Sequence, residues 1–358
     1  MEPLIQSHAD IVVAGGGPAG VAAAIAAARL GADVTLVERY GFLGGMATNG
    51  FIFPFMPWHA GDREIIRGIW GEMCDRMKQY NAGRAWSYPG DFDVEGLKQI
   101  WLDMCLQAGV KILFHTLISD TMVENNRVKG IITHSKSGRE ELSAKLVIDC
   151  TGDGDVAARA GAPFEIGRSQ DGLMQPMTLH FRLGNVDKTK MPSREDINNL
   201  YNQGKAAGKI TNPREDLLWF DTSYTDQIHF NTTRVIKVDG TNRDDLTRAE
   251  IESRRQTVEL FDWITKTIPG FEHAYLLATG PQIGIRESRR IMGEHLVTDE
   301  ELLNLTKFPD AIALSSYPID IHNPSGTGTV LKMIPRGEYY SIPYRALVPL
   351  QIEGLLVA

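Results

Sequence analysis

The stretches Asp10-Ile-Val-Val-Ala14, Gly15-Gly-Gly-Pro-Ala-Gly20 and, after an alanine-rich segment, Asp33-Val-Thr-Leu-Val-Glu38 decide the expected fold. They predict a buried strand, a glycine turn, a helix and a second buried strand that ends in a carboxylate. Parts in this order form a βαβ unit that holds a dinucleotide at the glycine turn. The strand, the helix and the terminal acid make this signal far more specific than three spaced glycines alone.

Each residue type in this unit has a physical role. Gly15 allows a tight turn that a side chain would obstruct. Gly17 lets the backbone approach a pyrophosphate, and Gly20 lets the helix pack closely on the strand. The helix begins at Pro18, so its free N–H groups and positive end face the phosphates. Glu38 lies roughly 20 residues past the glycines, where an acid reaches a ribose hydroxyl pair and disfavours the 2′-phosphate of NADP.

Two further segments favour FAD over NAD. A second glycine pair, Gly44-Gly45, follows the strand that carries the acid, and a later apolar strand ends in Thr151-Gly-Asp153. A second glycine-rich turn lets backbone N–H groups approach a larger and more extended ligand. The sequence therefore predicts three strand ends around one long ligand.

Several separated stretches carry a resemblance to a known family. They are residues 10–38, 41–48, 93–98, 147–155, 284–294 and 342–347. In these stretches the chain resembles the FAD-dependent oxidoreductases of the glutathione-reductase-like flavoprotein superfamily, and within it the bacterial group described only as FAD-dependent oxidoreductase. The resemblance implies an α/β fold, in which a Rossmann-like FAD-binding domain with a parallel sheet and a β-meander carries an inserted α+β substrate domain. It identifies no substrate, because a fold and a cofactor do not determine function.

The glycine turns, the strand ends beside them and the resemblance together give a set of residues expected to bind FAD. The set is Gly15, Gly17, Pro18, Ala19, Gly20, Glu38, Arg39, Gly44, Gly45, Met46, Thr48, Ile118, Thr151, Gly152 and Asp153.

The chain is expected to divide into three segments. Residues 1–162 form the first part of the FAD-binding domain, 163–341 the substrate domain, and 342–358 a truncated return to the FAD-binding domain. In the resembled family, the strand that begins at Leu355 re-enters the nucleotide domain and leads to a glycine-containing segment and a helix that cover the flavin. A globular domain seldom stops inside an apolar strand, so we expect the natural protein to continue past Ala358.

Hydrophobic periodicity gives the expected elements. Helices are predicted over 63–80, 94–108 and 193–208, and from a Thr247–Glu250 capping box to about Ile268. Strands are predicted over 111–114, 121–123, 128–133 and 142–150, as a meander, and over 177–183 and 227–238. The apolar segment 51–59 is broken by prolines and is expected to be a loop.

Composition excludes several classes of function. The formal net charge of the 358 residues is −8, which argues against a nucleic-acid partner. We expect no membrane span and no signal peptide, hence a cytoplasmic protein. Cys74, Cys105 and Cys150 form no CxxC motif, so we expect buried free thiols, neither a redox disulfide nor an iron–sulfur site. No metal-ligand pattern is present, so we expect no metal.

Three arginines are the first candidates for substrate binding. Arg286, Arg289 and Arg290 are spaced i, i+3, i+4 and would share one face of a helix. That face could clamp an anionic substrate or stabilise negative charge on reduced flavin. The alternative is a salt-bridged helix in which Arg290 pairs with Glu294. The resemblance favours Arg286 as a catalytic residue.

His322 and Arg345 complete the predicted catalytic set. His322 lies in a Gly/Ser/Pro-rich loop, where a histidine titrates near neutrality and could act as the general base; the alternative is an exposed loop histidine. Arg345 belongs to a family-like loop that could line the pocket near the flavin, or could pack against the re-entrant strand. His180 and His229 are expected to be hydrogen-bonded sheet residues without a catalytic role.

The favoured interpretation is an enzyme with non-covalently bound FAD that transfers a hydride between a small organic substrate and the flavin. The alternative is a non-catalytic or cofactor-poor subunit or fragment, whose flavin site is completed by missing residues or by a partner. The substrate, the electron acceptor and the oligomeric state, a homo-oligomer included, stay open.

Overall fold

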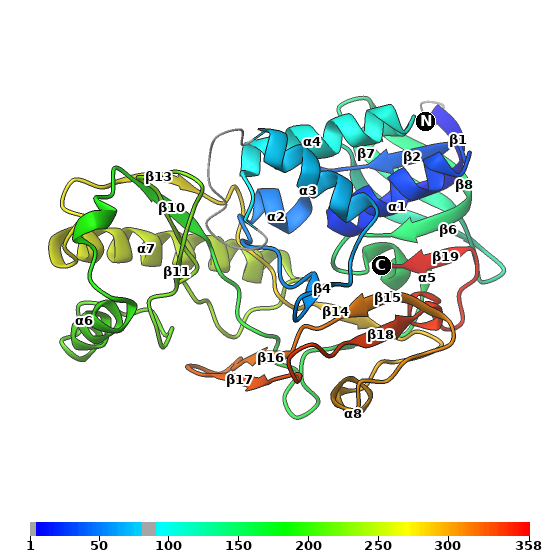
Figure 1. The fold of residues 1–358 in the computed structure, drawn as a ribbon. Coiled ribbons are helices and arrows are strands. Elements are labelled where there is room, and N and C mark those ends of the chain that lie inside the picture. Colours follow the sequence, from blue (N-terminus) through cyan, green and yellow to red (C-terminus); the bar gives the residue numbers. More distant parts are fainter. Residues whose placement is uncertain (1–4, 81–90) are drawn as a thin grey trace.

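A seven-stranded sheet collects strands from the first 150 residues and from the chain's last residues (Figure 1). The computed structural model describes residues 5–80 and 91–358, so 1–4 and 81–90 of the expected FAD-binding segment lie outside the described residues. The strand order is β5-β2-β1-β8-β7-β6, with β19 also paired to β8. The strands are β1 Ile5–Ala14, β2 Val34–Val37, β5 Lys111–Leu113, β6 Leu117–Glu124, β7 Arg127–Ser135, β8 Gly138–Asp149 and β19 Leu355–Val357.

The parallel strands bring their carboxyl ends to one edge of this sheet. β1 is parallel to β2 and β8, and Ala14 lies between Val37 and Asp149 in the register. β19 is parallel to β8, so the chain returns to this sheet as the resemblance implied. β6, β7 and β8 pair antiparallel, which confirms the predicted meander. The glycine turn after β1 and the residues that follow β2 and β8 therefore lie side by side.

Two glycines of the first turn are required by the fold itself. Gly15 has φ +104°, and a Cβ there would lie 2.4 Å from the Cys150 carbonyl oxygen. A Cβ on Gly20, in the first helical turns of α1 Pro18–Arg29, would lie 1.8 Å from the Gly15 carbonyl oxygen. The helix thus packs on the turn at a distance that no other residue permits.

Helices cover both faces of the sheet. α1 packs with α3 Ile69–Tyr80 and α4 Val94–Gln107 over one face (Figure 1), in a core centred on apolar residues such as Ile25, Leu36 and Met104. α5 Asp155–Ala160 packs on β6 and β8. The short helix α2 Gly45–Asn49 follows the second glycine pair.

The helix predicted over 63–80 begins later than expected. Residues before α3 form a small hairpin, β3 His59–Ala60 and β4 Arg63–Glu64. Gly61 and Gly68 both have positive φ values, +58° and +66°, which a right-handed helix does not accommodate. The apolar periodicity was therefore correct only for the residues after Gly68.

The middle of the chain forms a second sheet with two helices. β10 Phe181–Gly184, β11 Trp219–Asp221, β12 Ile228–Phe230 and β13 Tyr275–Thr279 pair antiparallel in the order β11-β12-β10-β13. α6 Arg194–Ala206 and α7 Arg243–Thr267 share an apolar core with this sheet (Figure 1). Both predicted strands, 177–183 and 227–238, are real but shorter than expected.

The predicted start of the long helix is wrong. α7 is capped by Asn242, whose side chain accepts hydrogen bonds from the amides of Asp244 and Asp245. Thr247 lies one turn inside the helix, where its hydroxyl donates to the carbonyl of Arg243. The Thr247–Glu250 spacing matched a capping box, but Asn242, five residues before Thr247, provides the cap.

The remaining elements join the two sheets. β9 Phe164–Ile166 pairs with β14 Arg289–Ile291, β15 Ala311–Ser315 with β18 Tyr340–Pro343, and β16 Ile319–His322 with β17 Thr329–Lys332. The other short elements are α8 Asp299–Leu303 and the 3₁₀ turns η1 Lys188–Lys190 and η2 Tyr344–Leu347. The boundaries at residues 162 and 341 stay a prediction. No helix of the described residues is both long and apolar enough to cross a bilayer.

The three cysteines are buried and free, as predicted. Burial raises the pKa of Cys74 to about 11 and the pKa of Cys105 and Cys150 to about 12. All three are therefore protonated thiols at neutral pH, which suits packing and not redox chemistry.

Gly20→Ala should destabilise the protein by about 3 kcal/mol or more, because the new methyl group collides with backbone that cannot move away. Gly71→Ala is the matched control. Gly71 lies inside α3, a Cβ there meets nothing within 4 Å, and alanine should stabilise the helix by up to about 1 kcal/mol. Urea unfolding without added cofactor measures both. Equal stability of Gly20→Ala and wild type would contradict the packing argument.

Candidate functional site

A cavity of about 210 Å³ lies at the sheet edge where β1, β2 and β8 end. Eleven of the fifteen predicted cofactor residues line it: Gly15, Gly17, Pro18, Ala19, Glu38, Arg39, Gly45, Met46, Ile118, Thr151 and Gly152. Residues that the sequence reasoning missed also line it: Gly16, Val37, Tyr40, Thr116, Leu117, Cys150, Asp155 and Ala358. Most of these adjoin a predicted strand end, which is the signal that could have found them.

The other four predicted residues lie beside this cavity and do not line it. Gly20 packs against Gly15, as described above. A Cβ on Gly44, which has φ +122°, would lie 2.3 Å from the side chain of Thr48. The Thr48 hydroxyl itself donates to the Leu43 carbonyl at 2.8 Å and so holds the second glycine turn. Asp153 lines a neighbouring cavity with Arg39.

Glu38 links the acid-bearing strand to the glycine turn. Its carboxylate accepts hydrogen bonds from the Gly16 amide at 2.8 Å and the Tyr40 amide at 2.9 Å. Burial raises the pKa of this carboxyl although these bonds oppose the shift. A carboxylate has about four lone-pair positions, and the amides of Gly16, Tyr40 and Arg39 act on this one, so capacity for a hydroxyl group in the cavity remains.

The space in front of Gly17 fits a phosphate group. Gly17 is the N-cap of α1, with an ordinary negative φ, and a Cβ there would meet only Gly45 Cα, at 3.7 Å. The fold therefore does not need glycine at this position, whereas a ligand at the helix N-terminus does. The residues present fit a dinucleotide bound at its pyrophosphate.

A second cavity of about 710 Å³ adjoins the first, and Met46 lines both. One part of its wall is apolar: Ile52, Phe53, Met56, Leu218, Phe220 and Leu331. The other part is charged or polar: His180, Arg214, Glu215, Asp216, Arg286, Tyr317, Asp320, His322 and Thr329. Two of the three predicted catalytic residues, Arg286 and His322, therefore meet in one cavity.

The predicted arginine helix does not exist. Arg289 and Arg290 lie in strand β14, where Arg289 pairs with Asp155 at 2.9 Å and Arg290 with Glu165 at 2.6 Å. The alternative pairing of Arg290 with Glu294 is wrong too. Adjacent residues of a strand point to opposite faces, and pairing with β9 separates these side chains from Arg286.

Arg286 lines the second cavity, where the carboxylate of Asp320 is the charge that acts on it most strongly. The Arg286 side chain keeps a solvent-accessible surface toward the cavity, while the surrounding protein lowers its pKa through burial. No hydrogen bond or ion pair joins it to another of the described residues. It is therefore a positive charge at the cavity wall without an ion pair among the described residues.

Arg345 lines neither cavity. Its guanidinium forms an exposed ion pair with Asp310, with distances of 2.9 Å and 3.3 Å. The prediction that it lines the pocket near the flavin is wrong, because Asp310 on the neighbouring loop holds it at the surface.

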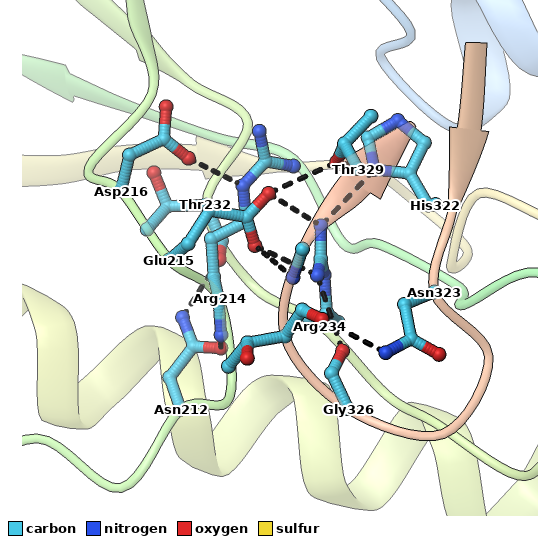
Figure 2. Close-up of polar contacts among 12 residues, drawn as sticks. Asn212, Arg214, Glu215, Asp216, Thr232, Arg234, His322, Asn323, Gly326 and Thr329 are labelled. Atoms are coloured by element: carbon cyan, nitrogen blue, oxygen red, sulfur yellow. Dashed lines mark hydrogen bonds and ion pairs between the residues drawn. The ribbon is translucent and has the colours of Figure 1, made fainter. Parts of the chain in front are cut away.

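His322 does not titrate near neutrality. It ends strand β16 and is 8% exposed, so it is neither in a loop nor on the surface. Burial, followed by the positive charge of Arg286, lowers its pKa to about 4. Its Nδ1 lies 3.0 Å from Nη2 of Arg234 (Figure 2). Because an arginine only donates hydrogen bonds, Nδ1 is the acceptor, and the hydrogen of the neutral ring is on Nε2.

Arg234 is the centre of the network shown in Figure 2. It is fully buried and pairs with Glu215 at 2.8 Å. Burial alone would raise the pKa of Glu215, but amide hydrogen bonds, Arg234 and the Thr329 hydroxyl together lower it to about 2. Arg214 pairs with Asp216 at 2.8 Å in the same region. Sequence reasoning missed this network, since its members come from distant segments without a shared motif.

Comparison with known proteins identifies the family of this chain. Residues 10–358 match the family described as FAD dependent oxidoreductase. The chain belongs to this family. FAD is the cofactor of the family, and the residues that line the cavity at the glycine turn fit its pyrophosphate. No group of three or more His, Cys, Asp or Glu side chains among the described residues is arranged to hold a metal ion.

Individual relatives are more distant. The chain is 30% identical over 166 residues to thiamine thiazole synthase of Aeropyrum pernix, covering 42% of this chain and 57% of that protein. It is 29% identical over 169 residues to digeranylgeranylglycerophospholipid reductase of Methanoculleus marisnigri, covering 44% and 42%. The chain thus spans about half the length of the curated relatives it matches.

A solved structure extends the likeness in fold. The p-nitrophenol 4-monooxygenase of Pseudomonas putida superposes with a TM-score of 0.51, covering 82% of this chain and 71% of that one. The sequence identity is 14%, so this likeness concerns the fold alone. The Rossmann-type α/β architecture of a flavoprotein, predicted from the sequence, is confirmed.

The lowered pKa of His322 predicts a loss of stability in acid. Between about pH 6.5 and 4, His322 binds a proton in the unfolded chain but stays neutral in the folded protein. As the pH falls through this range, the free energy of unfolding should therefore decrease by up to about 1.4 kcal/mol per pH unit for this group. His322→Asn should show a smaller fall than wild type, and His134→Asn, at an exposed site, the same fall as wild type. Urea titrations at pH 7, 6 and 5 measure this. Parallel profiles for His322→Asn and wild type would contradict it.

Proposed function

We propose that this chain is an FAD-dependent oxidoreductase that transfers a hydride between a small organic substrate and non-covalently bound FAD. The observation that carries the proposal is the junction of two cavities at Met46. One cavity has the glycine turn and the acid of a dinucleotide site. The other has an apolar wall and a charged wall, the features of a substrate site.

In this proposal the predicted cofactor residues bind different parts of FAD. The α1 N-terminus and the backbone at Gly17 bind the pyrophosphate, and Glu38 accepts hydrogen bonds from the ribose. Met46, directly after the second glycine turn, lies where the first cavity adjoins the second. Bound flavin would accept or donate the hydride, and the protein supplies position, charge and exclusion of water.

The residues of the second cavity would bind the substrate and hold its protons. Arg286 faces the cavity as a positive charge. His322 acts in this proposal as a positioning group that donates from Nε2, and not as the general base expected from the sequence. A base needs a free lone pair and a pKa near the working pH, whereas Nδ1 of His322 is occupied by Arg234 and the pKa is about 4.

Gly17→Val should separate cofactor binding from folding. A Cβ at Gly17 meets only Gly45 Cα, at 3.7 Å, so we expect the fold to accept the side chain while it fills the space before the helix N-terminus. The Kd for FAD should therefore rise at least about tenfold, equal to about 1.4 kcal/mol. The unfolding midpoint of the cofactor-free protein should change little. Fluorescence titration of free FAD and urea unfolding measure the two effects. Unchanged FAD affinity would remove the assignment of this cavity.

The purified protein should be yellow, and denaturation should release all of its FAD. Anaerobic photoreduction of the flavin followed by a panel of small organic substrates then tests hydride transfer, read as bleaching or return of the flavin absorbance. A protein that stays colourless with added FAD would overturn the proposal. That result would favour the alternative of a cofactor-poor subunit or fragment whose flavin site another part completes.

A further inference from the structure

Two buried histidines of the second cavity are converted into hydrogen-bond donors by arginines behind them. His322 is the simpler case, because Arg234 donates to its Nδ1 and leaves the hydrogen on Nε2. His180 is controlled through an intermediate ring. Arg182 Nε donates to His229 Nδ1 at 3.2 Å, and His229 Nε2 lies 2.9 Å from His180 Nδ1.

The chain of hydrogen bonds determines the tautomer of His180. Burial lowers the pKa of His229 well below its usual range and that of His180 to about 3, so both rings are neutral at pH 7. Since His229 Nδ1 accepts from Arg182, its hydrogen is on Nε2 and points to His180 Nδ1. The hydrogen of His180 is then on its own Nε2. This atom is fully buried, and the Phe51 carbonyl is the backbone acceptor that acts on the ring.

The backbone supports this arrangement. Arg182 and His229 face each other in the register of β10 and β12, so strand pairing brings the donor to the ring. The Phe51 carbonyl opposes part of the pKa lowering of His180, as an acceptor near an N–H group does. His180, His229 and Arg182 are all at most 7% exposed.

Arg286 lies near these donors and supplies the charge. Its guanidinium is close enough to be the leading electrostatic influence on the pKa of both His180 and His322. The other two arginines of the site have carboxylate partners, since Arg214 pairs with Asp216 and Arg234 with Glu215. Within the described residues, Arg286 is the cavity-lining arginine without an ion pair.

We infer that the second cavity recognises a carboxylate group of a small organic substrate, which Arg286 binds as an ion pair. This inference rests on the proposed function, because it names the substrate class of that reaction. The planar guanidinium binds a carboxylate through two parallel hydrogen bonds. The rest of the substrate would lie against the apolar wall formed by residues such as Phe53, Leu218 and Phe220.

The charges of the cavity favour a carboxylate over a phosphate. Glu215, Asp216 and Asp320 also line the cavity. Asp320 is engaged by the Tyr317 hydroxyl at 2.9 Å and lies 3.4 Å from His322 Nε2. A single unpaired guanidinium compensates one negative charge. The second charge of a phosphate would meet these carboxylates without a cation of its own.

Calorimetric titration of the FAD-loaded protein tests the inference. The probes are benzoate and propionate, the neutral benzamide and propionamide of the same shapes, and inorganic phosphate. The carboxylates should bind at least about tenfold more tightly than the amides, and phosphate more weakly than the carboxylates. Arg286→Gln should lose at least about tenfold in benzoate affinity while keeping its flavin absorbance and FAD content. Arg290→Gln, four residues away and paired with Glu165 at the surface, should bind benzoate like wild type.

Three results would overturn the inference: equal affinity for benzoate and benzamide, tighter binding of phosphate than of benzoate, or unchanged benzoate binding in Arg286→Gln. Nitrogen NMR of labelled histidines gives an independent test, in which His180 and His322 should be neutral at pH 6 with the hydrogen on Nε2. A hydrogen on Nδ1 of either ring would overturn the tautomers assigned here to the two histidines. Failure of the proposed function is distinguishable, because it shows as a colourless protein, whereas these results concern a yellow one.

Discussion

The contact between Gly20 and the Gly15 carbonyl is the constraint on which the rest of the structure depends. It seats α1 directly on the turn that ends β1, with no room for a methyl group. This seating aims the helix N-terminus along the sheet edge where β2 and β8 also end. The positive end of the helix, Glu38 and the turn after β8 then surround one cavity. A helix displaced by one side chain would separate these groups from one another.

The second cavity obeys a different constraint, the desolvation of charge. Arginines that are buried need partners, and here the partners are of two kinds. Arg214 and Arg234 pair with carboxylates, while Arg182 and Arg234 also donate to histidine nitrogens. Burial keeps both rings neutral, and the donation to one ring nitrogen leaves the hydrogen on the other. The same buried arginines thus stabilise the wall of the second cavity and occupy the acceptor nitrogens of its histidines.

Local patterns in the sequence predicted the elements whose cause is local. The glycine turn, the β-meander and α4, with its Asp93 cap, depend on residues close in sequence and were correct. The helix predicted over 63–80 is wrong before Ile69, because residues 63–64 pair in a hairpin and Gly68 has a positive φ. Spacing also suggested a helix at 286–290, where pairing of β14 with β9 forms a strand instead. In that case pairing with a strand more than 100 residues away outweighed the helical spacing of the arginines.

The sequence by itself determined that this chain carries a dinucleotide site, because the residues that build one lie within thirty or so positions and each has a steric or electrostatic reason for its type. It also indicated Arg286 and His322, but not what they do. Only the tertiary structure decided the surroundings of these two residues. The pKa and tautomer of His322 depend on Arg234, and those of His180 on Arg182 and His229, residues brought together by strand pairing and burial. Interactions of this kind depend on distance in space and on exclusion of water, and neither is written in the spacing of residues along the chain.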